Sequence, residues 1–182
     1  MRAPEAVATA RLVLRRPLAA DARAIFVRYA GDSAVTRFLG WPTHRSLADT
    51  HRFLAFCDAE WAHRGVGPYL LLSRHDGRLL GSAALGLESP RQAAAGYLLA
   101  RDAWGQGYAT ESLSAMRGLA AALGVRRLYA VCHPEHHASR RVMEKCGLRR
   151  EGILRGRAHF PNLRPGVAAD VVCYATSFET AS

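Results

Sequence analysis

Residues 97–111 are Tyr97-Leu98-Leu99-Ala100-Arg101-Asp102-Ala103-Trp104-Gly105-Gln106-Gly107-Tyr108-Ala109-Thr110-Glu111. The first four form an apolar run of strand length, and from Tyr108 onward apolar side chains recur at helical spacing. Gly105 and Gly107 flank Gln106, and glycine permits the positive φ angles and the close ligand approach typical of a tight turn. The stretch therefore predicts a strand, a turn and the start of a helix.

A helix start of this kind favours the binding of an anion. The first N–H groups of a helix have no acceptor within it, and they carry a partial positive charge. Glycines directly before them let a phosphate or pyrophosphate approach the main chain. Two glycines and a helix are a weak pattern, however, and a turn that only packs a helix onto a sheet is the alternative.

The sequence of residues 97–111 resembles the coenzyme A loop of the GNAT superfamily of acyltransferases. It is most similar to the Rim-type branch, which acetylates protein N-termini and small amines, although the general pattern has Arg or Gln in place of Trp104. The resemblance implies that main-chain amides hold the pyrophosphate of coenzyme A. The residues implied are Trp104, Gly105, Gln106, Gly107, Tyr108, Ala109 and Thr110.

Two more segments resemble the same branch, in the same order along the chain. Residues 11–15 match its first strand, and residues 138–148, followed by Glu151-Gly152 and Leu154-Arg155, match a short helix and the next strand. The resemblance implies one GNAT domain over residues 1–182, with residues 1–8 flexible. The implied fold is α/β, a mixed and mostly antiparallel sheet of six to seven strands flanked by about four helices.

Apolar periodicity and turn residues predict the individual elements. The expected helices are 21–29, 46–65, 108–124 and 138–146, with a further helical turn at 35–39. The expected strands are 11–15, 68–73, 79–87, 93–100, 127–132, 148–155 and 170–178. The strand–helix–strand unit around residues 108–124 predicts a parallel strand pair with a right-handed crossover.

Composition limits the classes of function. The chain has 182 residues, and its net charge of +10 would suit nucleic acid, ribosomes or an anionic cofactor. No nucleic-acid motif accompanies the charge, so direct nucleic-acid binding is not expected. No membrane-spanning run or signal peptide is found, so we expect a cytoplasmic protein without membrane contact. Four cysteines without a CxxC pair are expected to be reduced and buried.

The resemblance also implies residues around the reacting atoms. Ser139 is expected to face the sulfur of coenzyme A, where its hydroxyl can hydrogen-bond the leaving group, or else to cap the short helix. His136 stands where the branch often has an Asn that contacts coenzyme A or substrate. Leu98 and Leu99 are expected along the pantetheine arm, and Arg101 or Arg140 at the outer phosphate.

The general base is not evident from the sequence. Relatives often carry Glu at the positions of Ala95 or Ala158. The remaining candidates are His159, Glu88 and Asp170, and His159 has the most suitable ordinary pKa, about 6.5.

The two-helix region before residue 68 walls the acceptor cleft in relatives. Trp41 and Trp61 are therefore candidate cleft residues, with a role as core aromatics as the alternative.

These observations predict an N-acetyltransferase that uses acetyl-CoA as cosubstrate and needs no metal. A primary amine, either a protein N-terminus or a small molecule, would attack directly in a ternary complex. The missing carboxylates favour an α-amine or another weakly basic amine, because its neutral form is accessible near pH 7. A ribosomal protein and a second copy of the chain are candidate partners.

Three alternatives stay open. The chain could be a catalytically weak coenzyme A-binding module of the same fold. His133, Glu135, His136 and His137 could hold a metal, although their spacing matches no standard zinc motif. The basic surface could bind nucleic acid or a ribosome.

Overall fold

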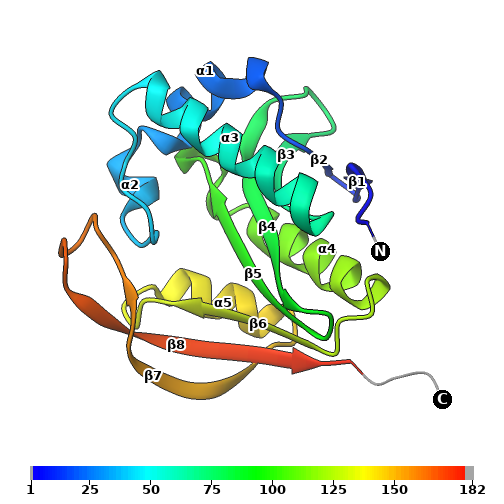
Figure 1. Cartoon of the computed structure of the whole chain (residues 1–182), viewed down its shortest axis with the longest axis vertical. Coiled ribbons are helices and arrows are strands. Elements are labelled where there is room, and N and C mark those ends of the chain that lie inside the picture. The colour runs from blue at the N-terminus through cyan, green and yellow to red at the C-terminus, as the bar shows by residue number, and fades with distance from the viewer. Residues whose placement is uncertain (1, 179–182) are drawn as a thin grey trace.

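The fold is built on one eight-stranded sheet, seen in a computed structural model that describes residues 2–178 (Figure 1). The strands lie in the order β1-β2-β3-β4-β5-β6-β8-β7, and every neighbouring pair is antiparallel except β5 and β6. The parallel pair around the central helix is therefore confirmed. The strands are β1 (Ala6–Ala8), β2 (Leu12–Arg15), β3 (Pro68–Ser73), β4 (Leu79–Ser89), β5 (Gln92–Leu99), β6 (Arg127–Cys132), β7 (Arg149–His159) and β8 (Ala168–Ser177).

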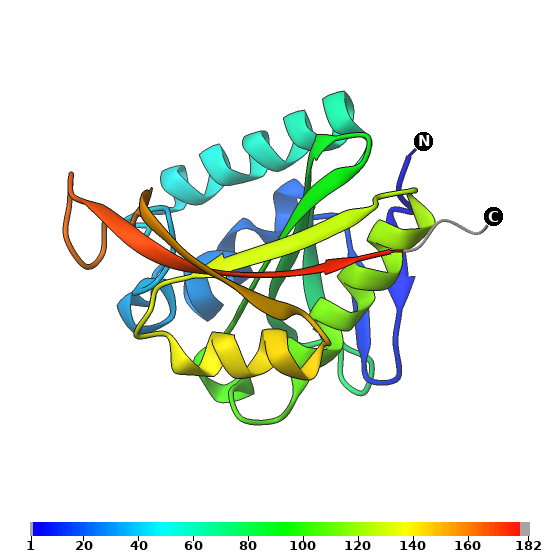
Figure 2. The ribbon, with the colours of Figure 1, turned by 90° about the horizontal axis from the view of Figure 1, so that it is seen from below.

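The helices cover both faces of the sheet. Figure 2 shows α3 on one side and α4 and α5 on the other. The α-helices are α1 (Ala22–Ile25), α2 (Ser33–Thr36), α3 (Leu47–Arg64), α4 (Tyr108–Ala122) and α5 (His137–Lys145). Short helical turns η1 (Ala19–Asp21), η2 (Phe26–Ala30) and η3 (Arg101–Ala103) complete the set. The mixed, mostly antiparallel sheet flanked by helices that the sequence predicts is confirmed, with one strand and one helix more than expected.

The bounds of α3 follow from its end residues. Ser46 and Asp49 form a capping box at its start, and Gly65 ends it with a left-handed φ of +68°. On the opposite face of the sheet, α4 buries Leu113, Met116 and Ala120, each fully inaccessible to solvent. This apolar face fixes α4 against β4 and β5 and so determines where the helix begins.

The N-terminal segment differs from the expectation of flexibility. Residues 6–8 form β1, which pairs with β2. Tyr69 Oη donates to the Pro4 carbonyl at 2.7 Å, and the Ala3 N–H donates to Gly65 O at 2.8 Å. These contacts come from residues more than 60 positions away in sequence, so local composition gave no indication of them.

Residues 19–40 also differ in detail from the predicted helices. The expected helix 21–29 is part of a continuous run of η1, α1 and the π-helical η2 over residues 19–30, and Leu18, not Asp21, is its N-cap. The Asp21 carboxylate accepts from the Leu18 N–H and from Arg15. The helical turn expected at residues 35–39 lies at Ser33–Thr36, where the Asp32 side chain accepts from the Ala34 N–H.

The four cysteines are free and buried, as expected. Burial raises the pKa of the Cys57 thiol to about 12 and that of Cys132 to about 11, so both stay neutral near pH 7. None of the helices in the described part of the chain has the length and apolarity needed to span a bilayer.

Replacing Leu113 by Ala should lower the free energy of unfolding by about 2 to 5 kcal/mol, because a fully buried Leu leaves a cavity under α4. Equilibrium denaturation in urea measures this change. Leu18→Ala is the control, since that side chain is 57% exposed and its truncation should cost less than about 0.5 kcal/mol. Equal unfolding free energies for the two variants would contradict the assigned role of α4.

Candidate active site

The turn between β5 and α4 presents unpaired main-chain N–H groups. Gly105 and Gly107 have φ angles of +74° and +82°. From Gly105 to Thr110, no N–H donates to an acceptor in residues 2–178. The following helix is 15 residues long, so its partial positive charge adds to these donors. The turn is therefore suited to hold a diphosphate on the main chain.

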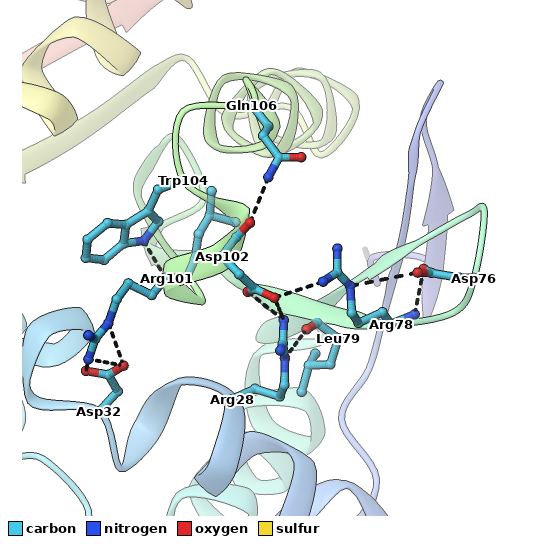
Figure 3. Close-up of polar contacts among 10 residues, drawn as sticks. Arg28, Asp32, Asp76, Arg78, Leu79, Arg101, Asp102, Trp104 and Gln106 are labelled. Atoms are coloured by element: carbon cyan, nitrogen blue, oxygen red, sulfur yellow. Dashed lines mark hydrogen bonds and ion pairs between the residues drawn. The ribbon is translucent and has the colours of Figure 1, made fainter.

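Side chains of the turn fix its shape (Figure 3). The indole Nε1 of Trp104 donates to Leu99 O at 2.8 Å, which ties the turn to the end of β5. Gln106 Nε2 donates to Asp102 O at 2.7 Å. From outside the turn, Arg11 Nη1 donates to Gln106 O at 2.9 Å. Trp104 thus positions the main chain, which explains how the turn is held without the more usual Arg or Gln.

Three ion pairs attach the turn to η2, to the segment before β4 and to the N-cap of α2 (Figure 3). Asp102 accepts from Arg28 at 2.7 Å and from Arg78 at 2.8 Å. Arg101 pairs with Asp32 at 2.6 Å. The neighbouring guanidinium holds the pKa of each carboxyl below its usual range. The predicted contact of Arg101 with an outer phosphate would require it to leave Asp32.

The sheet opens directly beside this turn. Strands β5 and β6 pair only through Gln92–Ala94 and Arg127–Tyr129. Beyond Ala94, β5 keeps β4 as its partner but has no pairing with β6. Leu98 and Leu99 lie on this half-paired part of β5, so main-chain groups are available there to a ligand.

Ser139 faces this opening from α5. It is 9% exposed and lies inside the helix, whose N-cap is His136, so the alternative role of Ser139 as the cap is wrong. Tyr97 Oη, from β5, donates to Ser139 O at 3.0 Å and lies 2.8 Å from Ser139 Oγ. Burial raises the pKa of Tyr97, so its hydroxyl stays neutral. Two neutral hydroxyls therefore meet where β5 leaves β6.

A cavity of about 560 Å³ lies on the other side of β5, toward α3. Gly96, Tyr97 and Leu98 line it, so it adjoins the same part of the strand as the opening. Most of its wall is apolar. The remaining lining residues are Leu39, Trp41, His44, Asp49, Arg52, Phe53, Phe56, Pro68, Ser82, Ala83 and Ala84.

The two predicted cleft tryptophans have different environments. Trp41 lines the cavity and stacks on Phe53 with ring centroids 6.3 Å apart. Trp61 is 4% exposed, lies edge-on to Tyr69, and donates from Nε1 to Pro68 O at 3.0 Å. The prediction that Trp61 lines the cleft is wrong, because its indole is enclosed in the core beneath Pro68.

Comparison with known proteins decides the family. Residues 11–149 match the family described as "Acetyltransferase (GNAT) domain". The chain belongs to the GNAT family of acetyltransferases. The recognition of this family from the coenzyme A loop is confirmed, and acetyl-CoA is the cosubstrate that follows from membership.

Individual relatives of this GNAT chain agree with the family match. It is 29% identical over 150 residues to YoaA, an uncharacterized N-acetyltransferase of Bacillus subtilis, covering 81% of this chain and 84% of that one. A GNAT acetyltransferase structure from Bacillus anthracis superposes with a TM-score of 0.81 at 24% identity, covering 94% and 98% of the two chains. RimL, a ribosomal L7/L12 α-N-protein acetyltransferase solved with coenzyme A, has a TM-score of 0.82 at 23% identity, covering 95% and 98%.

Three other predicted site residues are His136, the N-cap of α5, Arg140 on α5 and His159 at the end of β7. His136 stacks on Phe38 with ring centroids 4.7 Å apart, and burial lowers its pKa. Arg140 donates from Nε to Tyr174 Oη at 3.4 Å. His159 is exposed at the end of β7 and does not line the cavity. The roles assigned to these three side chains stay predictions.

The two remaining base candidates already have partners. Glu88 accepts from Tyr129 and Gln92 at the far end of β4, and Asp170 accepts from the Gly156 N–H at 2.9 Å. In residues 2–178, no group of three or more His, Cys, Asp or Glu side chains is arranged to hold a metal ion.

Two residues of this region had no distinguishing pattern in the sequence. Asn162, in the β7–β8 turn, donates to Thr36 O at 2.8 Å and Trp41 O at 2.9 Å, and its Oδ1 accepts from the Thr43 N–H at 2.9 Å. It braces the loop that carries Trp41. His44 follows on that loop and lines the cavity. Asn162 depends on contacts with residues more than 110 positions away, and His44 on the rings and the Thr50 hydroxyl around it, and neither follows a sequence motif.

Replacing Trp104 by Phe should weaken coenzyme A binding by about 2- to 10-fold, because the turn loses its hydrogen bond to Leu99 O but keeps an aromatic ring. Isothermal titration calorimetry gives the dissociation constant. Phe56→Leu, on the acceptor side of β5, serves as the control and should bind coenzyme A like the wild type. Unchanged affinity in Trp104→Phe would show that the indole does not position the turn.

Proposed function

We propose that this chain transfers the acetyl group of acetyl-CoA to the amino group of an acceptor that carries an apolar substituent. The observation that carries the proposal is the continuity of three features along β5. The unpaired amides of residues 105–110 follow β5 in the chain, and the edge of β5 toward β6 is unpaired beyond Ala94. The apolar cavity adjoins the same strand at Gly96, Tyr97 and Leu98.

The donor would lie along the opening of the sheet. Its diphosphate would accept from the N–H groups of residues 105–110, and its pantetheine arm would follow Leu98 and Leu99. A main-chain N–H of that unpaired segment would stabilise the oxyanion that forms on the thioester carbonyl. The thioester sulfur would then lie near Ser139, and the acetyl carbon would face the cavity.

The acceptor nitrogen attacks the carbonyl carbon, so that a C–N bond forms and the C–S bond breaks. Coenzyme A leaves as a thiolate, whose conjugate thiol has a pKa of about 8.5. The Ser139 hydroxyl, held beside Tyr97 Oη, hydrogen-bonds this sulfur as it leaves. The amine loses one proton and the thiolate gains one, so the products are an amide and free coenzyme A.

The cavity wall favours an apolar acceptor over a polycation. Trp41, Phe53 and Phe56 supply aromatic surface. Asp49 is the carboxylate of the wall, and its oxygens already accept from the N–H groups of Arg45 and Ser46 and from Arg52. A polyamine or aminoglycoside would find no free anionic partner there.

A protein N-terminus is one acceptor that fits these conditions. An α-amine has a pKa of about 8 and is partly neutral at pH 7, and the residue that bears it can place an apolar side chain in the cavity. RimL, which shares the fold, is described as a ribosomal L7/L12 α-N-protein acetyltransferase. We therefore place the chain in the Rim-type branch of the family.

An acceptor panel tests the proposed function. Acetyl-CoA and the purified protein are incubated with peptides that begin with Leu, Phe, Ser or Asp, with the same peptides blocked at the N-terminus, and with spermidine. Release of free thiol should be fastest with Leu and Phe peptides and absent with blocked ones. Faster turnover of spermidine would contradict the apolar acceptor, and coenzyme A binding without turnover of any amine would favour a binding module.

Replacing Ser139 by Ala should lower kcat by about 100-fold while coenzyme A affinity stays the same, because the hydroxyl acts on the leaving sulfur and not on the diphosphate. Steady-state kinetics with the best peptide provide the measurement. Ser89→Ala, an exposed serine at the end of β4, is the matched control and should retain wild-type kcat. A Ser139→Ala enzyme of full activity would remove this residue from the mechanism.

A further inference from the structure

Acetyl transfer to an amine needs a proton acceptor on the acceptor side of β5. The positions where relatives carry Glu are Ala95 and Ala158, and neither side chain can take a proton. Asp49 lines the cavity, but four donors from Arg45, Ser46 and Arg52 occupy its oxygens. These contacts lower the pKa of Asp49 and make it a poor base.

His44 is the remaining side chain of the cavity that can accept a proton near neutral pH. Its ring packs against both Trp41, 5.1 Å away, and Phe53, 6.2 Å away, measured between ring centroids. Its main-chain N–H donates to Ala30 O at 2.9 Å. The loop and the ring are therefore both fixed in place, as a residue that handles protons requires.

One ring nitrogen of His44 is engaged and the other is available. Nδ1 lies 2.9 Å from Oγ1 of Thr50, which is fully buried in α3. Nε2 has no hydrogen-bond partner among residues 2–178. If Nδ1 carries the proton and donates it to Thr50, the lone pair of Nε2 is free to accept a proton from a group in the cavity.

Burial is the main influence on His44, and it lowers the pKa of the imidazole below the ordinary 6.5. Among the neighbouring charges, the anion of Asp49 raises this pKa and the cation of Arg52 lowers it. From β5, Tyr97 also lines the cavity, and burial raises the pKa of its hydroxyl. His44 is thus neutral at pH 7 and gains its charge only on acidification.

We propose that His44 is the general base of the reaction, with Thr50 as the residue that positions its ring. This proposal rests on the proposed function. Nε2 of His44 accepts the proton that the acceptor nitrogen loses as the C–N bond forms, and Nδ1–H donates to Thr50 Oγ1 throughout. The proton then passes to water, and the imidazole is ready for the next turnover.

The test is the pH dependence of kcat/KM for the best amine, in the wild type and in His44→Gln. The wild type should lose activity on acidification more steeply than the titration of the amine alone would predict, because both the amine and His44 must be neutral. His44→Gln should lose about 100-fold or more at pH 7 and follow only the titration of the amine. Its affinity for coenzyme A should equal that of the wild type.

His51→Gln is the matched control, because His51 is an exposed histidine on α3 beside Thr50. It should keep the wild-type rate and pH profile. His159→Gln tests the base predicted from the sequence. If that variant, and not His44→Gln, loses the additional dependence on pH, the proposal for His44 is overturned.

Thr50 is tested by a pair of substitutions. Thr50→Val keeps the shape but removes the hydroxyl, so kcat should fall and the acid limb of the profile should shift. Thr50→Ser restores the hydroxyl and should restore the wild-type profile. A rate in Thr50→Val equal to that of Thr50→Ser would remove Thr50 from the proposal.

Failure of this proposal is distinguishable from failure of the proposed function. An active wild-type enzyme whose pH profile is the same as that of His44→Gln contradicts the base alone. A wild type that binds coenzyme A but acetylates no amine contradicts both proposals.

Discussion

The site depends on an interrupted strand pairing. Strand β5 shares hydrogen bonds with β4 over its whole length, but it pairs with β6 only through Gln92–Ala94. Where a protein leaves main-chain groups of a strand unpaired, a ligand or water must satisfy them. Here the unpaired segment runs directly into the unpaired amides of residues 105–110. In the proposed function, donor binding is therefore mainly a property of the backbone.

Side chains serve this arrangement chiefly as supports. Trp104, Gln106 and Arg11 fix the turn, and the ion pairs of Asp102 and Arg101 join it to η2, to the segment before β4 and to the N-cap of α2. Exposed ion pairs of this kind contribute at most about 1 kcal/mol each. Their contribution is therefore mainly geometric, because they fix the turn relative to η2 and to the turn between β3 and β4.

The sequence predicted the features that local chemistry determines. Gly105 and Gly107 indicated the turn, and Ser46 and Gly65 the ends of α3, because caps and positive φ angles depend on a few adjacent residues. It did not predict β1 or the enclosure of Trp61 beneath Pro68. The three residues of β1, Ala-Val-Ala, carry no strand pattern of their own, and the burial of Trp61 depends on how α3 packs against β3.

Neither His44 nor Asn162 lies in a sequence motif, so the sequence did not identify the residues that form or brace the cavity wall. Asn162 links the end of the chain to the wall of the cavity. Its amide joins the β7–β8 turn to Thr36 and Thr43, residues more than 110 positions earlier in the chain. It also donates to the carbonyl of Trp41, whose side chain lines the cavity. The shape of this wall therefore depends on a residue that the chain supplies only after β7.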